Sequence, residues 1–197
     1  LDVPVVMGSK STYVRGKIGG YEGRILKAGD VIKIGNASIG APSLIRLPQE
    51  FIPVYKNELT VRAVPGPQDD YFTEEGINTF ISSEYKVTNE ADRMGYRLEG
   101  PKIAHKKGAD IISDGITMGS VQVPGHGFPI VMMSDRQTTG GYTKIATVIT
   151  PDIDYVGQLK PGDKLRFKFV TVNEAHEIYK QYINKLNSIK SFVAMPQ

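Results

Sequence analysis

The densest group of chemically capable side chains in this sequence lies in one bend, residues 134–142. The bend carries a carboxylate, a guanidinium, an amide, hydroxyls, a glycine pair and a phenol, supplied by Asp135, Arg136, Gln137, Thr138, Thr139, Gly140, Gly141 and Tyr142. A simple reversal between two strands needs only two turn residues. The composition of the bend therefore predicts a binding site.

The chemistry of the bend favours a ligand with carbonyl or carboxylate oxygens. Arg136 can hold a planar carboxylate or ureido group through two parallel hydrogen bonds, which a lysine cannot do. The backbone at Gly140 and Gly141 can approach a ligand closely because neither residue has a Cβ. In the alternative interpretation, Asp135 and Arg136 pair with each other and the threonines bond the bend.

Two further groups of polar residues lie beside glycines. Asp92 and Arg93 stand in a turn between two expected strands, where they either contribute to a site or clamp the turn through a salt bridge. Residues 9–24 combine hydroxyls and arginines with several glycines, which fits either a functional loop or an ordinary glycine-rich one.

Composition excludes several classes of function. The 197 residues carry a formal charge of only +3 without a basic helix, so a nucleic-acid partner is not expected. The absence of cysteine excludes thiol catalysis and disulfides and fits a cytoplasmic protein. No apolar run approaches membrane-spanning length, so no membrane partner is expected. The three histidines share no metal-ligand spacing, so we predict no metal site.

Short apolar runs separated by glycine and proline predict a mainly β fold, either a barrel or a sandwich. The expected strands are 31–34, 59–64, 84–88, 96–99, 116–123, 129–134, 144–149 and 165–172. Apolar residues at three- and four-residue steps predict a helix over 173–190 with Asn173 as its N-cap. This helix either packs on the barrel or docks a partner. Residues 78–83 predict a second, shorter helical turn.

Seven motifs occur in an order that gives a specific resemblance. They are Gly8–Tyr13, Gly19–Arg24, Leu26–Asp30, Asp92–Arg97, Gly119–Gly125, Asp135–Tyr142 and Gln158–Asp163. The series resembles the biotin-dependent carboxyltransferase family that includes allophanate hydrolase subunit 2 and KipA, whose stand-alone bacterial members are the C subunits of 5-oxoprolinase. The resemblance covers residues 1–174, and the ordered set is far more specific than any single motif.

The resemblance implies a cyclophilin-like, eight-stranded antiparallel β-barrel with a C-terminal helix. Residues 1–45 would be the tail of a preceding β-barrel segment, and residues 46–197 would form the cyclophilin-like domain with its helix at 173–190. The chain begins at Leu1, which suggests a piece of a longer protein.

The resemblance also implies a function. Similar proteins work with a KipI-like B subunit, together with an A subunit, to hydrolyse 5-oxoproline to glutamate at the expense of ATP, so the chain would be active only in the complex. It would bind no cofactor covalently and would leave ATP to the complex, because it has neither a biotin-attachment sequence nor an ATP motif. Two alternatives are a non-catalytic KipA-type protein that antagonises a histidine-kinase inhibitor and a urea- or allophanate-type carboxyltransferase domain.

For the leading function, we predict roles for particular residues. Arg136 would anchor the acidic or carbonyl oxygen as a catalytic residue, and Asp135 would orient it. Tyr142 would pack over the substrate ring. The other substrate-binding residues would be Gln122, Gln137, Thr138, Thr139, Gly140 and Gly141, with Asp92 and Arg93 as further candidates. Thr143 stands where the family usually has proline, so we expect a slightly looser bend.

Overall fold

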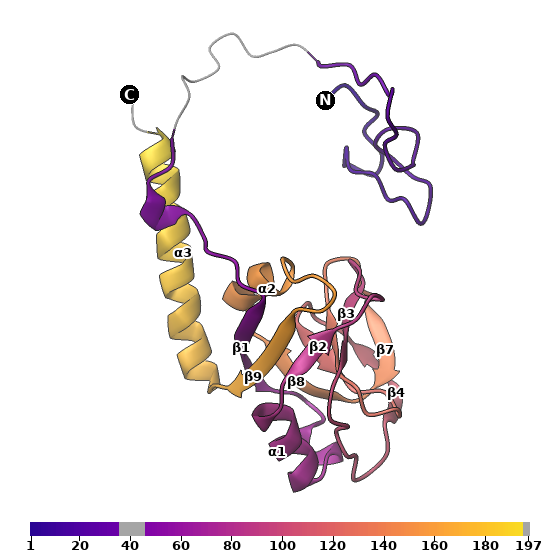
Figure 1. Cartoon of the computed structure of the whole chain (residues 1–197), viewed down its shortest axis with the longest axis vertical. Helices are drawn as coiled ribbons and strands as arrows, with labels where there is room; N and C mark the ends of the chain where they lie inside the picture. Colours follow the sequence, from indigo (N-terminus) through magenta and orange to yellow (C-terminus); the bar gives the residue numbers. More distant parts are fainter. Residues whose placement is uncertain (36–45, 195–197) are drawn as a thin grey trace. The chain divides into compact units, whose positions relative to one another are not determined.

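The computed structural model describes residues 1–35 and 46–194 of the chain (Figure 1). Two compact units are present, one built on Leu1–Arg46 and the other on Leu47–Pro196. Residue 45, where we expect the first segment to end, lies outside the described residues.

The first unit consists mainly of turns. Its described residues form isolated bridges between Val6 and Ser9 and between Tyr13 and Ile18. The guanidinium of Arg24 donates to both carboxylate oxygens of Asp30, each over 2.8 Å. The expected strand at 31–34 is absent from these described residues, and no ladder forms there.

The second unit is a closed barrel of seven strands in the order β1-β8-β5-β6-β3-β2-β9. These strands are β1 (Glu58–Pro65), β2 (Tyr85–Val87), β3 (Gly95–Glu99), β5 (Ser120–Gln122), β6 (Ile130–Met132), β8 (Lys144–Val148) and β9 (Lys164–Phe169). Two more strands, β4 (Asp110–Gly115) and β7 (Thr139–Tyr142), form a separate two-stranded sheet. The mainly β barrel is therefore confirmed, with seven strands in place of eight.

Two features distinguish this barrel from the expected antiparallel one. The first and last strands, β1 and β9, close it by pairing in parallel, with Glu58 opposite Lys164 and Ala63 opposite Phe169. The expected strand 116–123 shortens to β5 because Gly119 adopts a φ of +88°, and a Cβ there would lie 2.5 Å from the Val148 carbonyl oxygen. The chain therefore turns at Gly119 before it enters the ladder.

The barrel interior holds the hydrophobic core. Side chains from several strands are fully buried there, including Val61, Val121 and Ile145. The rings of Phe80 and Phe167 stack with their centroids 4.3 Å apart. Such alternating inward-facing residues are what a closed sheet needs on its inner face.

Two α-helices and two 3-10 turns flank the barrel strands. Helix α1 (Glu74–Ser82) begins earlier than the expected 78–83, because the Thr73 hydroxyl accepts a hydrogen bond from the Gly76 amide and caps the first turn. Helix α2 (Thr150–Val156) was not expected from the sequence, and Asp152 in its first turn accepts hydrogen bonds from Arg62 of β1. The 3-10 turns are η1 (Gln49–Phe51) and η2 (Asp69–Tyr71).

The C-terminal helix α3 (Val172–Ala194) follows β9 directly. Its N-cap is Thr171 rather than Asn173. The Thr171 hydroxyl accepts from the Glu174 amide, and the Glu174 carboxylate accepts from the Thr171 amide over 2.7 Å. This reciprocal arrangement is a capping box. Among the described residues, no helix combines the length and the apolar character needed to cross a membrane.

Candidate functional site

The polar bend is part of a strand. Residues 139–142 form β7, which pairs with β4 so that Asp114 stands opposite Gly140, and Gly115 opposite Thr139. We call this two-stranded β4–β7 sheet the arm. Since directly opposite residues of a ladder share one face, Asp114 and Gly140 face the same way.

A row of paired residues crosses the barrel. Arg97 of β3 stands opposite Ile130 of β6, which stands opposite Gln122 of β5, which in turn stands opposite Lys144 of β8. Opposite residues of a regular ladder project from the same face of the sheet, so the first three side chains form one line across three strands. A register shift between Val121 and Gln122 then brings Lys144 opposite Gln122. Gln122 and Lys144 are therefore neighbours.

The arm meets this row at Lys144. The Lys144 ammonium lies 2.8 Å from Oδ2 of Asp114, and its side chain is only 3% exposed, whereas that of Asp114 is 52% exposed. The hydrogen bond from Lys144 is the largest cause of the lowered pKa of the Asp114 carboxyl. Gln68 links the same pair, since its Oε1 accepts from the Lys144 amide over 3.1 Å. A buried ammonium is thus held by one carboxylate at the solvent edge.

The Gln122 side chain ends against the arm. The residue is 2% exposed, and its Nε2 has no hydrogen-bond partner within the described part of the chain. A Cβ added at Gly140 would lie 3.1 Å from this Nε2, 3.6 Å from Nε2 of Gln137 and 2.6 Å from Cδ1 of Ile116. Two amide groups therefore converge where the arm covers the barrel, and glycine is the residue that this close approach permits.

We call Gln122, Gln137, Lys144 and Asp114 the Gln122 cluster. It offers two carboxamides and an ammonium as donors, and a carboxylate as the acceptor at its solvent edge. An unpaired buried donor is costly, so its presence in a native fold points to a function or to an absent partner group. The donors of the cluster match carbonyl or carboxylate oxygens.

Arg136 occupies a different place from the one expected. Its Nε donates to the Ile116 carbonyl over 3.1 Å, and its Nη1 donates to the Met133 carbonyl over 3.3 Å. The expectation that Asp135 orients Arg136 is therefore wrong, and so is the alternative that the two residues pair with each other. The guanidinium instead ties the bend to the chain that precedes β5.

Asp135 joins the second predicted group of residues. Both of its carboxylate oxygens accept from the Arg93 guanidinium, over 2.8 and 3.0 Å, and this contact lowers the pKa of Asp135. Asp92 caps its own turn by accepting from the amides of Met94 and Gly95. The structure thus joins the 92–95 turn to the bend through a surface ion pair, with the Arg93 side chain 76% exposed.

The remaining predicted residues line the arm. The Thr138 carbonyl accepts from the Ile116 amide over 2.9 Å, so this part of the bend pairs with backbone. Thr139 is exposed, Gly141 is half-buried, and Tyr142 is 43% exposed opposite Asp110. Among the predicted residues, Gln122, Gln137 and Gly140 are the ones that the structure gathers around one point.

The bend is not loosened at Thr143, contrary to the expectation. Thr143 is fully buried, and its amide donates to the Ala109 carbonyl over 2.9 Å, which a proline could not do. Its hydroxyl donates to the Val123 carbonyl and lies 3.2 Å from Nε2 of His105. The threonine therefore anchors the end of β7 through side-chain and backbone contacts.

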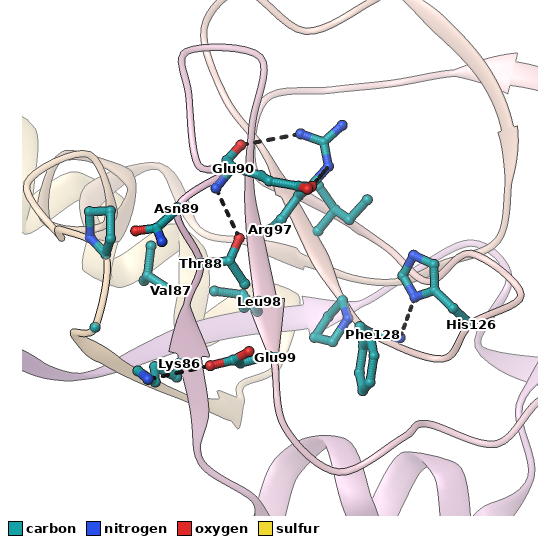
Figure 2. A pocket seen from close by; sticks show the side chains of 14 residues that line it. Lys86, Val87, Thr88, Asn89, Glu90, Arg97, Leu98, Glu99, His126 and Phe128 are labelled. Carbon is teal, nitrogen blue, oxygen red and sulfur yellow. Dashed lines mark hydrogen bonds and ion pairs between the residues drawn. The ribbon is translucent and has the colours of Figure 1, made fainter.

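A groove of about 620 Å³ lies beside the row, on the other side of Ile130 from Gln122. Figure 2 shows Arg97 turned toward Glu90 at one end and His126 against Phe128 at the other. Nδ1 of His126 accepts from the Phe128 amide. The groove contains none of residues 134–142 and ends one strand from Gln122.

Sequence reasoning missed Lys144 and Asp114. Lys144 begins an apolar strand, a position at which a lysine is usually solvated. Asp114 belongs to β4, whose residues Ile112–Gly115 are exposed and show no alternating pattern. A sequence signal for Lys144 does exist, because it immediately follows the polar bend.

The class of protein follows from comparison with known families. The family model of the carboxyltransferase domain, subdomain A and B, matches residues 1–169, and the chain belongs to this family. The chain is 38% identical to the C subunit of 5-oxoprolinase from Escherichia coli (strain K12) over 178 residues, which are 89% of this chain and 55% of that protein. It is 35% identical to the C subunit of 5-oxoprolinase from Haemophilus influenzae over 191 residues, which are 97% of this chain and 60% of that protein.

A solved structure has the same fold over nearly the whole chain. The K. lactis urea amidolyase superposes with a TM-score of 0.83 at 29% identity, covering 97% of this chain and 12% of that one. The chain spans between 55% and 60% of the length of the two 5-oxoprolinase proteins.

Proposed function

We propose that this chain is part of a cytoplasmic, ATP-dependent 5-oxoprolinase complex that hydrolyses 5-oxoproline to glutamate. Its partners would be a KipI-like B subunit plus the A subunit of that complex. The proposal is supported by the similarity to two proteins named as the C subunit of 5-oxoprolinase. The structural observation that carries it is the buried, unpartnered Nε2 of Gln122, which stands opposite the buried Lys144 in the ladder.

The chemistry of 5-oxoproline matches the donors of the Gln122 cluster. The molecule is a five-membered lactam that also bears a carboxylate. Hydrolysis places negative charge on the lactam oxygen, and donors fixed in a dry site stabilise that charge strongly. We assign the Gln122 amide to this oxygen and the Lys144 ammonium to the substrate carboxylate. Gln137 would complete the contacts from the arm.

The other residues predicted from the sequence take supporting roles in this proposal. Arg136 positions the bend through the carbonyls of Ile116 and Met133, and the Asp135–Arg93 pair holds the bend against the 92–95 turn. We assign no covalently bound cofactor to this chain, and we assign ATP to the complex as a whole.

The test is ATP-dependent 5-oxoproline hydrolysis by the reconstituted complex, with and without the full-length form of this chain. We expect turnover only when the chain is present, and a Lys144→Met variant should raise the KM for 5-oxoproline at least tenfold. Lys180→Met is the matched control, because Lys180 makes an exposed ion pair with Glu177 within α3, outside the cluster. Equal turnover without the chain would contradict the proposal.

A carboxyltransferase acting on urea is the second candidate. It is favoured by the match to the urea amidolyase structure over 97% of this chain. Urea also presents a single carbonyl oxygen to the same donors. Carboxylation of urea by the reconstituted protein, with no turnover of 5-oxoproline, would select this candidate. Stable capture of the KipI-like partner without either activity would instead select a non-catalytic KipA-type binder.

A further inference from the structure

One pair of residues in the arm covers the two buried donors of the Gln122 cluster. Asp114 and Gly140 stand opposite each other in the β4–β7 ladder. A Cβ at Gly140 would lie 3.1 Å from Nε2 of Gln122, and Oδ2 of Asp114 lies 2.8 Å from the Lys144 ammonium. Gln122 and Lys144 are each only 2% exposed. A ligand therefore cannot reach either donor while this pair stays in place.

The contact between Asp114 and Lys144 is one that a ligand can replace. An ammonium has three donor hydrogens, and within the described residues the Lys144 ammonium donates to one side chain, that of Asp114. A buried charge that loses its partner is costly. A carboxylate from solution that binds Lys144 as Asp114 leaves it avoids this cost, because it keeps the ammonium paired. The Asp114 side chain is 52% exposed, so its own carboxylate can return to water.

The arm has little burial of its own to hold it down. Neither β4 nor β7 contains a buried residue, whereas every residue of β5 is buried. A two-stranded sheet without a core is marginally stable in water. The ladder also shifts register between Asp110 and Asp114. Buried residues follow each strand, Ile116 after β4 and Thr143 after β7, and fix the two ends of the arm. The arm can therefore bow away from the barrel without losing its attachment.

We propose that Asp114 occupies the place of a ligand carboxylate, and that a carboxylate-bearing ligand displaces it from Lys144 and so lifts Gly140 from the Gln122 amide. The inference rests on the proposed function for the identity of the ligand, 5-oxoproline. Its carboxylate releases the arm, and its lactam oxygen then meets the Gln122 amide. Asp114 is thereby a specificity-determining residue, because a lactam without a carboxylate has no group that replaces it on Lys144.

The first test asks whether the arm opens while the barrel stays folded, and it needs neither substrate nor partner. The chain has no cysteine, so Gln122→Cys and Val121→Cys each supply a single thiol on β5. Val121 belongs to the barrel core, so the Val121→Cys thiol reacts with iodoacetamide only when the barrel unfolds. The Gln122→Cys thiol should react at least about tenfold faster, each rate being taken relative to the same variant unfolded in urea. Equal rates would overturn the proposal.

A second measurement asks whether Asp114 holds the arm closed. Asp114→Asn added to Gln122→Cys should speed the thiol reaction at least about threefold, and should change the rate of Val121→Cys less. Asp110→Asn is the matched control, because it removes the same charge from an exposed position of the same strand, opposite Tyr142, and should leave the rates unchanged. A rate that Asp114→Asn leaves unaltered, or raises equally at both thiols, would contradict the proposed role of Asp114.

The third measurement tests the exchange of carboxylates in the reconstituted complex. A site that is mostly closed binds its ligand more weakly, in proportion to the fraction that is open. The KM for 5-oxoproline should therefore fall in Asp114→Asn by at least the factor that this change gives at the Gln122→Cys thiol. The unaltered complex should be inhibited poorly by 2-pyrrolidinone, the same lactam without a carboxylate, and the Asp114→Asn complex should be inhibited more strongly.

A purely structural role for Asp114 predicts the opposite kinetic result. In that case Asp114→Asn raises the KM or lowers kcat, and either result would overturn the exchange. Absence of turnover with the unaltered chain would instead refute the proposed function, and the exchange with 5-oxoproline would fall with it. The thiol rates separate these failures, because they report on the arm without any substrate.

Discussion

Replacing Gln122 with methionine should stabilise the barrel while removing its proposed function. The Gln122 side chain is 2% exposed, and its Nε2 lacks a partner among the described residues. A buried donor that is left unpaired costs about 1–3 kcal/mol. Methionine has a similar length and flexibility and carries no donor, so Gln122→Met removes this cost without leaving a cavity.

The expected gain in stability is the cost of the unpaired donor minus the cost of repacking around methionine. Allowing about 1 kcal/mol for imperfect packing of the sulfur against Ile116 and Gly140, we expect the free energy of unfolding to rise by up to about 2 kcal/mol. For a domain of this size, the larger gain raises the melting temperature by about 4–8 °C.

The assay is urea unfolding of the chain followed by circular dichroism, with thermal melting as a second measurement. Gln137→Met is the control, because this amide reaches the same point from an exposed position and its loss should change stability by no more than about 0.5 kcal/mol. A Gln122→Met variant that is less stable than the unaltered chain would show that the amide nitrogen is satisfied, and would refute the reasoning.

Three further predictions concern the cluster and the contact between α2 and β1. Gly140→Ala places a Cβ 2.6 Å from Cδ1 of Ile116 and should lower the free energy of unfolding in urea by about 1–2 kcal/mol. An unchanged free energy of unfolding would mean that the arm is not closely packed at Gly140. Asp152→Asn weakens the acceptor of the Arg62 hydrogen bonds and should lower the free energy of unfolding in urea by about 2–3 kcal/mol. An unchanged free energy of unfolding would mean that this contact does not stabilise the fold. Because the folded-state pKa of Asp114 is lowered, its ion pair stabilises the fold fully above its ordinary pKa of 3.8, and this contribution disappears as the pH falls through the lowered value. The melting temperature of Asp114→Asn should therefore lie below that of the unaltered chain at pH 7 and converge with it in acid, and a constant difference would argue against the ion pair.

The barrel was largely predictable because most of its strands have a clear local sequence signal. The runs that became β1, β8 and β9 are rich in valine, isoleucine and phenylalanine, and such residues favour a pleated surface buried on one side. β7 gave no such signal, since its residues, Thr139–Tyr142, become a strand only by pairing with β4. The parallel contact of β1 with β9 is equally non-local, and no turn signal marks it.

The Gln122 cluster was predicted only in part from the sequence. Gln122, Gln137 and Gly140 were among the residues predicted from residue type and resemblance, and the structure places them together. The contacts of Arg136 and Asp135 were not predicted, because the sequence does not distinguish an arginine that bonds two backbone carbonyls from one that binds a ligand. Lys144 joins the Gln122 cluster only through its register opposite Gln122, which the sequence does not specify.

The most direct test of the central claim is the kcat/KM for 5-oxoproline of the complex reconstituted with full-length Gln122→Met. Since this variant should fold more stably than the unaltered chain, any loss of activity reports on the site itself. If the Gln122 amide holds the lactam oxygen, kcat/KM should fall by about 100-fold or more while the complex still assembles. Unchanged kcat/KM in an intact complex would contradict the account.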